Sequence, residues 1–157
     1  MKRQVVKITP EDALVRLERM CVRAEHCTAE MRQKLRQWGI SDSDADSVVC
    51  SLVDRRFVDD ARYAAAFVRD RYRFARYGRV KIGIALKTKH ISPDIIAEAM
   101  EEIDSETYLD ILRSVISAKA KSLPRPLSME DRNRIFRHAI SRGYESALVS
   151  KIIKELG

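Results

Sequence analysis

Apolar positions along this chain recur every three to four residues, the spacing of amphipathic helices. No segment alternates convincingly with the period of two that marks a half-buried strand, although Val5 to Ile8 could form a short extended lead-in. Glycine and proline are scarce, with five and four residues. The pattern therefore predicts an all-α protein with nine helices, over residues 10–26, 28–38, 43–56, 60–76, 79–89, 93–103, 105–122, 128–142 and 145–156.

Residues typical of helix boundaries flank several of these segments. Thr9, Ser92 and Ser128 each precede a first turn that contains proline or acidic residues, as N-caps do. Gly39 and Gly143 follow helical segments and fit left-handed C-caps. These signals support the predicted starts and ends.

The helices divide into three sets of three that resemble one another. Residues 35–41 align without a gap with 86–92, at an offset of 51, and residues 139–145 follow at a further offset of 53. Such a period predicts a tandem array of three-helix repeats, over 9–57, 58–104 and 105–157, after a lead-in of 1–8. Since one such unit buries little core alone, we expect neighbours to pack in a row and form an elongated, curved molecule.

Positive charge is concentrated in the second repeat. The whole chain has a net charge of +7, but residues 61–91 hold nine basic side chains and one acid, Asp70. The remainder of the chain is therefore close to neutral, with a net charge of −1. A localised basic face of this kind is typical of proteins that bind a polyanion or an acidic partner.

The segment 60–76 is expected to place different side chains on three sides. One side is small and apolar and includes Ala64 and Val68. A second side forms a ridge of arginines: Arg62, Arg69, Arg73 and Arg76. The third side is aromatic and consists of Tyr63, Phe67 and Phe74. We interpret these side chains as core between repeats, and the alternative is that they stack on nucleic acid bases.

The inventory of reactive residues does not support an enzyme. Phosphate-binding glycine loops, nucleophile elbows and zinc-protease motifs are all missing from the sequence. Asp59 and Asp60 precede a helix, so we interpret them as capping residues rather than metal ligands. The three cysteines, Cys21, Cys27 and Cys50, form no C-x-x-C pair, which argues against a disulfide framework or a zinc site. We expect no cofactor and no bound metal.

Neither end of the chain nor its interior predicts membrane insertion. No window of about 18 uncharged apolar residues occurs, and the N-terminal residues lack the apolar core of a signal peptide. The sequence is therefore interpreted as that of a cytoplasmic protein.

A set of motifs in and beside the second repeat resembles the RecX family, whose members regulate the bacterial recombinase RecA. The resemblance rests on Phe57-Val-Asp-Asp-Ala-Arg-Tyr-Ala64, Tyr77-Gly78, Ile82, Leu86, Lys89 and Ile91-Ser92. The sequence departs from the family pattern at His90, where glycine is usual, and at Arg79, where proline is common. His90 is therefore expected to end a helix in a left-handed conformation despite its Cβ.

The resemblance implies a fold, a partner and a contact surface. RecX proteins form a curved row of three-helix repeats and bind in the groove of the RecA filament on single-stranded DNA. They restrain strand exchange, ATP hydrolysis and the RecA-promoted self-cleavage of the SOS repressor, and they are not enzymes. Carried over to this chain, the expected contact residues are Arg69, Arg73, Arg76, Arg79, Lys81, Lys87 and Lys89.

Two other functions remain open from the sequence. The same basic residues could neutralise DNA phosphates in a plain helical DNA-binding protein. The chain could also be a helical adaptor for an unrelated acidic partner. Under the RecX interpretation, direct binding to naked DNA is expected to be weak or secondary, and the protein is expected to be a monomer.

Overall fold

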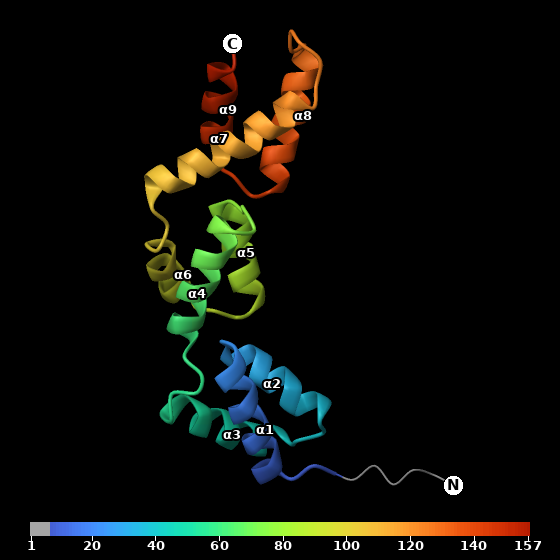
Figure 1. Cartoon of the computed structure of the whole chain (residues 1–157). Helices are drawn as coiled ribbons and strands as arrows, with labels where there is room; N and C mark the ends of the chain where they lie inside the picture. Colours follow the sequence, from blue (N-terminus) through green and yellow to red (C-terminus); the bar gives the residue numbers. More distant parts are fainter. Residues whose placement is uncertain (1–6) are drawn as a thin grey trace, which may run out of the picture. The chain divides into compact units, whose positions relative to one another are not determined.

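The computed structural model describes residues 7–157. Within them the chain is entirely helical, with nine α-helices and no strand (Figure 1). The all-α prediction is confirmed. Of the predicted lead-in 1–8, residues 1–6 lie outside the described part of the chain, and Lys7 and Ile8 carry no regular secondary structure.

All nine predicted helices are present, with most boundaries within three residues of the expectation. Their bounds are α1 Pro10–Arg23, α2 Thr28–Gln37, α3 Asp42–Asp54, α4 Asp60–Arg73, α5 Arg79–Thr88, α6 Pro93–Met100, α7 Ser105–Lys121, α8 Met129–Ser141 and α9 Ser146–Glu155.

The helix starts show why these boundaries could be predicted. The Thr9 hydroxyl accepts the backbone N–H of Asp12 at 3.1 Å, and the Ser92 hydroxyl accepts that of Ile95 at 3.4 Å. Ser128 and Asp131 form a reciprocal capping box at the start of α8. Each bond satisfies a backbone donor that the helix itself leaves free.

The ends of α2, α5 and α8 have the same conformation, which supports the repeat alignment. The residues after them have positive φ: Gly39 at 75°, His90 at 57° and Gly143 at 94°. One residue further, a backbone N–H returns to the helix, from Ile40 to Leu35, from Ile91 to Leu86, and from Tyr144 to Ala139. The offsets of 51 and 53 therefore match equivalent positions, and His90 takes the left-handed conformation expected of it.

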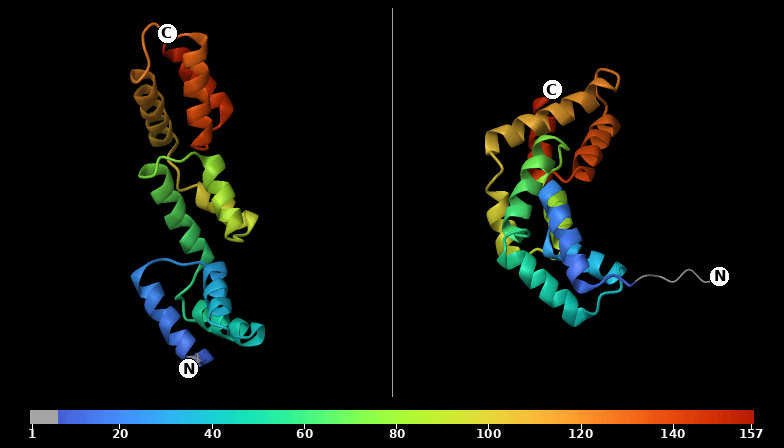
Figure 2. Two further views of the ribbon diagram at one scale, coloured as in Figure 1. Left: turned by 90° about the vertical axis from the view of Figure 1, so that its right-hand side faces the viewer. Right: turned by 60° about the horizontal axis from the view of Figure 1, so that its bottom comes forward.

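The chain divides between Tyr63 and Ala64, inside α4, into two compact units. In the first unit, α1 and α2 pack against α3 (Figures 1 and 2). The core of this unit is built from apolar residues of all three helices and of the segments that follow α2 and α3: Ala13, Leu17, Met31, Leu35, Ile40, Ala45, Val48, Val49, Leu52 and Val58.

The second unit contains the rest of α4 and helices α5 to α9. In it, α5 packs against α6, and α7, α8 and α9 pack against one another as a bundle (Figures 1 and 2). Ala64 and Val68 of α4 are buried, as the helical wheel predicted for that side, and Tyr72 of the same helix is buried as well. Leu86 of α5 is also fully buried, at the position equivalent to Leu35 of the first repeat.

The prediction is wrong for one residue that was expected in the core. Phe74 was expected among the core aromatics, but its side chain is 80% exposed. The reason is that α4 ends at Arg73, so Phe74 does not continue the helical wheel on which the prediction was based. Tyr63, by contrast, is buried, and Phe67 is half-buried beneath the guanidinium of Arg71, 4.4 Å from the ring centroid.

Candidate partner-binding surface

Arg69 and Arg73 form an exposed pair of cations on α4. They are spaced four residues apart, so they lie on one flank of the helix. Arg69 forms an ion pair with Glu102 at 3.2 Å, with both side chains more than a third exposed. Solvent screens such a pair, which stabilises a fold by about 0–1 kcal/mol and is easily exchanged for a contact with a partner.

Arg73 has polar neighbours but no ion pair within the described residues. Its Nε donates to the hydroxyl of Tyr72 at 2.8 Å. The pKa of Asp104 lies below its ordinary value, chiefly because the carboxylate accepts hydrogen bonds from the backbone and hydroxyl of Thr107, with a smaller effect from the charge of Arg73. The Arg73 guanidinium thus keeps most of its charge available at the surface.

Arg76 does not belong to the ridge that the sequence predicted. The helix was expected to run to residue 76, but α4 ends at Arg73 and Arg76 has a φ of 57°. Side chains of the third repeat bond the backbone of this turn. Arg142 donates from Nη2 to the Ala75 carbonyl and from Nε to the Arg76 carbonyl at 3.1 Å. These carbonyls are therefore satisfied without further helical turns.

At the other end of the predicted ridge, the Arg62 guanidinium also forms hydrogen bonds within its own unit, the first. Its Nε donates to the carboxylate of Glu25 at 2.7 Å, and a terminal nitrogen bonds the carbonyls of Arg56 and Phe57. Of the four predicted ridge residues, the structure thus keeps Arg69 and Arg73 as an exposed pair on one helix flank.

Arg79 is neutralised inside the protein rather than left free. Its guanidinium pairs with Glu145 at 2.9 Å and lies 4.1 Å from the ring centroid of Tyr108. The Tyr108 hydroxyl donates to Glu145 and accepts the backbone N–H of Arg79. Burial, and then the bond to Glu145, raise the pKa of Tyr108, so its hydroxyl keeps its proton. This group of three side chains joins the second repeat to the third.

The three lysines of the predicted set are distributed over α5. Lys81 lies in the first turn, 4.3 Å from the ring centroid of Tyr77, and Lys87 lies in the last turn. Six residues separate them, so they project about 120° apart around the helix. Lys89 is the C-cap residue and is half-buried. Lys81 and Lys87 are exposed, and neither forms an ion pair within the described residues.

The start of α5 is held by backbone bonds across the junction of repeats. The N–H groups of Gly78 and Val80 donate to the carbonyls of Arg142 and Gly143 at 2.8 and 3.0 Å. The carbonyls that close α8 therefore cap the first turn of α5. The two segments of the chain approach so closely here that a Cβ on Gly78 would overlap the Gly143 backbone. This packing fixes where Arg76 and Arg79 lie relative to the third repeat.

Sequence reasoning missed a second group of basic residues, around a hollow of about 380 Å³. Arg76 lines it from the turn after α4, Lys119 from α7, and His138 and Arg142 from the end of α8. These residues are separated by as many as 66 positions in the chain, so no local motif indicates that they meet.

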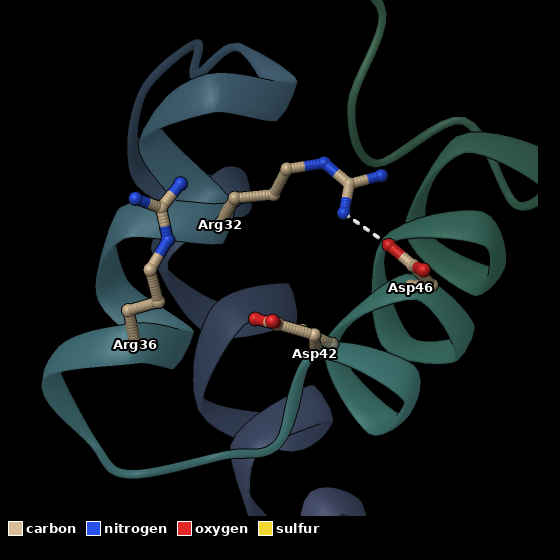
Figure 3. A pocket seen from close by; sticks show the side chains of 5 residues that line it. Arg32, Arg36, Asp42 and Asp46 are labelled. Carbon is tan, nitrogen blue, oxygen red and sulfur yellow. Dashed lines mark hydrogen bonds and ion pairs between the residues drawn. The ribbon is translucent and has the colours of Figure 1, made fainter.

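A hollow of about 350 Å³ in the first unit has a different electrostatic character. Arg32 and Arg36 on α2 face Asp42 and Asp46 on α3. Figure 3 shows Arg32 reaching across to Asp46, with which it forms an ion pair, and the Asp42 carboxylate pointing toward α2. Two basic and two acidic side chains balance, so nothing there favours a charged ligand.

Asp59 lies just before α4 and Asp60 is its first residue, and both have the capping roles that were predicted. Asp59 accepts the backbone N–H of Arg62 at 3.0 Å, which caps α4 itself. Asp60 instead accepts the backbone N–H and the hydroxyl of Thr28, both at 2.9 Å, and so caps α2. Within residues 7–157 no group of three or more histidine, cysteine or acidic side chains is arranged to hold a metal ion.

Among the helices of residues 7–157, none is both long and apolar enough to cross a membrane.

Comparison with known proteins identifies the family. Residues 13–52 match the sequence model of the first three-helix domain of RecX, and residues 59–100 match that of the second, together just over half of the chain. This chain belongs to the RecX family. The matched ranges correspond to the first two predicted repeats, and the predicted family resemblance is confirmed.

Individual relatives agree with the family models. The regulatory protein RecX of Prosthecochloris aestuarii is 29% identical over 134 residues, which cover 84% of this chain and 85% of that protein. The regulatory protein RecX of Clostridium perfringens strain 13 is 26% identical over 158 residues, covering 97% and 74%. Both are named regulatory proteins rather than enzymes, and a regulatory role follows for the family.

Solved RecX structures share the fold. The crystal structure of RecX from Lactobacillus salivarius superposes with a TM-score of 0.78 at 19% identity, covering 93% of this chain and 97% of that one. A second crystal structure, of a regulatory protein RecX, gives a TM-score of 0.79 at 18% identity and covers 99% and 78%. The tandem three-helix architecture is thus that of the family.

Proposed function

We propose that this chain binds the RecA filament on single-stranded DNA and restrains its activities, mainly by inhibition. The observation that carries the proposal is the concentration of nine basic residues against one acid over residues 61–91 of a RecX-family chain. The proposed contact residues are those expected from the sequence: Arg69, Arg73, Arg76, Arg79, Lys81, Lys87 and Lys89.

These seven residues are not expected to contribute equally. Arg69, Arg73, Lys81 and Lys87 are exposed and can exchange weak internal contacts for acidic groups on a partner. Arg79 already pairs with Glu145, so it contributes mainly by holding the junction of repeats in place. Long-range attraction to an acidic groove depends on the sum of the exposed charges, which also accelerates association.

Tandem repeats suit a partner that is itself repetitive. Contacts that are individually weak combine when they are linked, because the second contact forms at a high effective concentration. A row of repeats can therefore hold several filament subunits with modest affinity for each. If the bound row fits one filament pitch better than another, it shifts the filament toward that pitch and away from productive strand exchange and ATP hydrolysis.

In this proposal the chain acts without chemistry of its own. It needs no cofactor, works as a monomer in the cytoplasm where RecA filaments form, and limits SOS-repressor self-cleavage by occupying the filament. Binding to naked DNA is secondary. The rival function is plain DNA binding, in which the same cations neutralise phosphates without any specific contact to RecA.

The deciding experiment is a titration of RecA ATPase activity on single-stranded DNA. We expect inhibition well below one molecule of this protein per RecA, because one bound row affects several subunits. Plain DNA binding predicts inhibition only at ratios that coat the DNA. If inhibition requires saturating protein and disappears when excess DNA is added, the proposal is wrong and the DNA-binding rival holds.

A further inference from the structure

The hollow beside Arg76 differs from the rest of the second unit in its charge. Three side chains that carry a full positive charge at neutral pH line it, Arg76, Lys119 and Arg142, and His138 adds an imidazole. None of the described residues that line it is acidic. Among residues 7–157, none of the three permanent cations forms an ion pair.

Arg142 is held in place by neutral groups. Its Nε and Nη2 donate to the backbone carbonyls of Arg76 and Ala75, and the guanidinium lies 5.3 Å from the ring centroid of Tyr77. Five N–H donors are available on a guanidinium, and these two bonds leave three of them for another acceptor. The charge is thus fixed in position without being neutralised.

Arg76 is positioned by the same contacts. Its left-handed backbone, with a φ of 57°, is fixed because its carbonyl accepts hydrogen bonds from both Arg142 and the Tyr144 hydroxyl, the latter at 3.0 Å. Its side chain is exposed. A strained backbone conformation of an arginine that is held by two neighbouring side chains is the kind of arrangement found at ligand sites.

Basic residues near helix ends have an ordinary explanation, which accounts for only part of this charge. The carboxyl ends of α4, α7 and α8 lie within a few residues of the hollow-lining side chains, and each helix end carries roughly −0.5 of a charge. Together these partial charges offset about half of the three cations. The remaining positive potential also acts on His138. Burial lowers the pKa of this imidazole most, and the charges of Lys119 and Arg142 lower it further.

From these observations we propose that the hollow binds a phosphate group. A tetrahedral phosphate can accept hydrogen bonds from several directions, which suits donors that converge from the turn after α4, from α7 and from α8. A carboxylate has two oxygens in one plane and fits fewer of them. The Ser122 hydroxyl donates to the Lys119 carbonyl at 2.6 Å, so the cationic side chains supply the donors.

The phosphate can come from a nucleic-acid backbone or from a free or terminal phosphate, and the site stands whether or not the chain acts on RecA. The proposed function depends mainly on the exposed cations of α4 and α5. The phosphate site is centred on the third repeat, and of the seven proposed RecA contacts only Arg76 belongs to it. A failure of one is therefore distinguishable from a failure of the other.

The test follows the imidazole resonances of His138 in the full chain by NMR, with His138→Gln to assign them. Inorganic phosphate is added at constant ionic strength, maintained with chloride. We expect a saturable shift of the His138 signal and a rise in its pKa, because a bound anion offsets the charges of Lys119 and Arg142. Lys119→Ala should weaken phosphate binding about tenfold, the loss of one charge-assisted hydrogen bond.

Lys121→Ala is the matched control, since it removes the same charge two residues away on α7, outside the hollow, and should leave phosphate binding nearly unchanged.

Parallel titrations distinguish the possible ligands. An oligothymidylate without terminal phosphates tests binding of the phosphodiester backbone, and a glutamate-rich peptide tests binding of carboxylates. Saturable, Lys119-dependent binding of phosphate or oligothymidylate supports the site and identifies the source. The proposal is overturned if neither binds, if Lys121→Ala weakens binding equally, or if the peptide binds as tightly as phosphate.

Discussion

At the scale of single residues, arginines of the second repeat differ in what surrounds them rather than in chemistry. Arg79 is paired with Glu145 and stacked on Tyr108, so its charge is neutralised at the junction of repeats. Arg69 and Arg73 lie exposed on one flank of α4, where charge is available to a partner. The same residue type therefore supports structure at one position and is available for recognition at another.

This difference leads to a prediction for charge reversal. Arg69→Glu combined with Arg73→Glu should leave the melting temperature nearly unchanged, because exposed substitutions alter stability by about 0.5 kcal/mol or less. Inhibition of RecA ATPase should weaken at least tenfold, which requires only about 1.4 kcal/mol of binding free energy. The wild-type inhibition should also decline as salt is added, since screening reduces attraction between exposed charges.

A matched control is available on α1. Arg19 and Arg23 have the same spacing of four residues, are exposed, and form no ion pair within the described residues. Arg19→Glu with Arg23→Glu changes the net charge equally but should inhibit RecA much as wild type does. A folded α4 double variant that inhibits as well as wild type would show that the binding surface lies elsewhere.

A second residue-scale prediction concerns His90, which has a φ of 57° at the position that Gly39 and Gly143 occupy in the other two repeats. A left-handed conformation costs an L-residue roughly 1–2 kcal/mol, while glycine loses about 0.5–1 kcal/mol more conformational freedom on folding. His90→Gly should therefore stabilise the protein by about 0.5–1 kcal/mol, measured by urea unfolding. Lys89→Gly, one residue earlier at a φ of −84°, should instead destabilise it.

At the scale of elements, the junction of α5 with α8 decides how two repeats are joined. The first turn of α5 is capped by backbone carbonyls that end α8, and the side chains of Arg142 and Tyr144 bond the turn after α4 in return. Both partners of this arrangement are turns, and each satisfies backbone groups that the other leaves free. The junction is therefore a fixed connection within the second unit.

Gly78→Ala tests this junction, because the added Cβ would overlap the backbone of Gly143 and Tyr144. Overpacking of this kind costs about 1–3 kcal/mol, and we expect at least that loss in urea unfolding. Gly83→Ala in the same helix is the control. Its Cβ would meet only the Cε of Met100, at 3.5 Å, so it should gain about 0.5–1 kcal/mol from helix propensity. Equal stabilities of the two variants would contradict the role of the junction.

At the scale of the whole molecule, three repeats in the sequence are distributed over two compact units. The division falls inside α4, and the second and third repeats share one unit because of their junction. The predicted boundaries 9–57, 58–104 and 105–157 stay predictions. The elongated, curved arrangement of the repeats also stays a prediction, which small-angle scattering can check.

Features that depend on neighbours along the chain could be predicted from the order of the amino acids alone. Helix starts could be predicted because Thr9, Ser92 and Ser128 bond donors three residues away. The repeat alignment could be predicted because each second helix ends through bonds within its own last turns, even where His90 replaces glycine. The local excess of positive charge over residues 61–91 can also be read directly from the sequence.

Which charges are free, and where they gather, depends on contacts between residues that are far apart in the sequence. Arg79 meets Glu145 across 66 positions, and Arg142 bonds the Ala75 carbonyl across 67, ending α4 earlier than its own periodicity predicts. The hollow beside Arg76 likewise assembles from three separate segments. Such contacts depend on how two repeats pack, and the packing follows from shapes and backbone groups that meet only once the chain is folded.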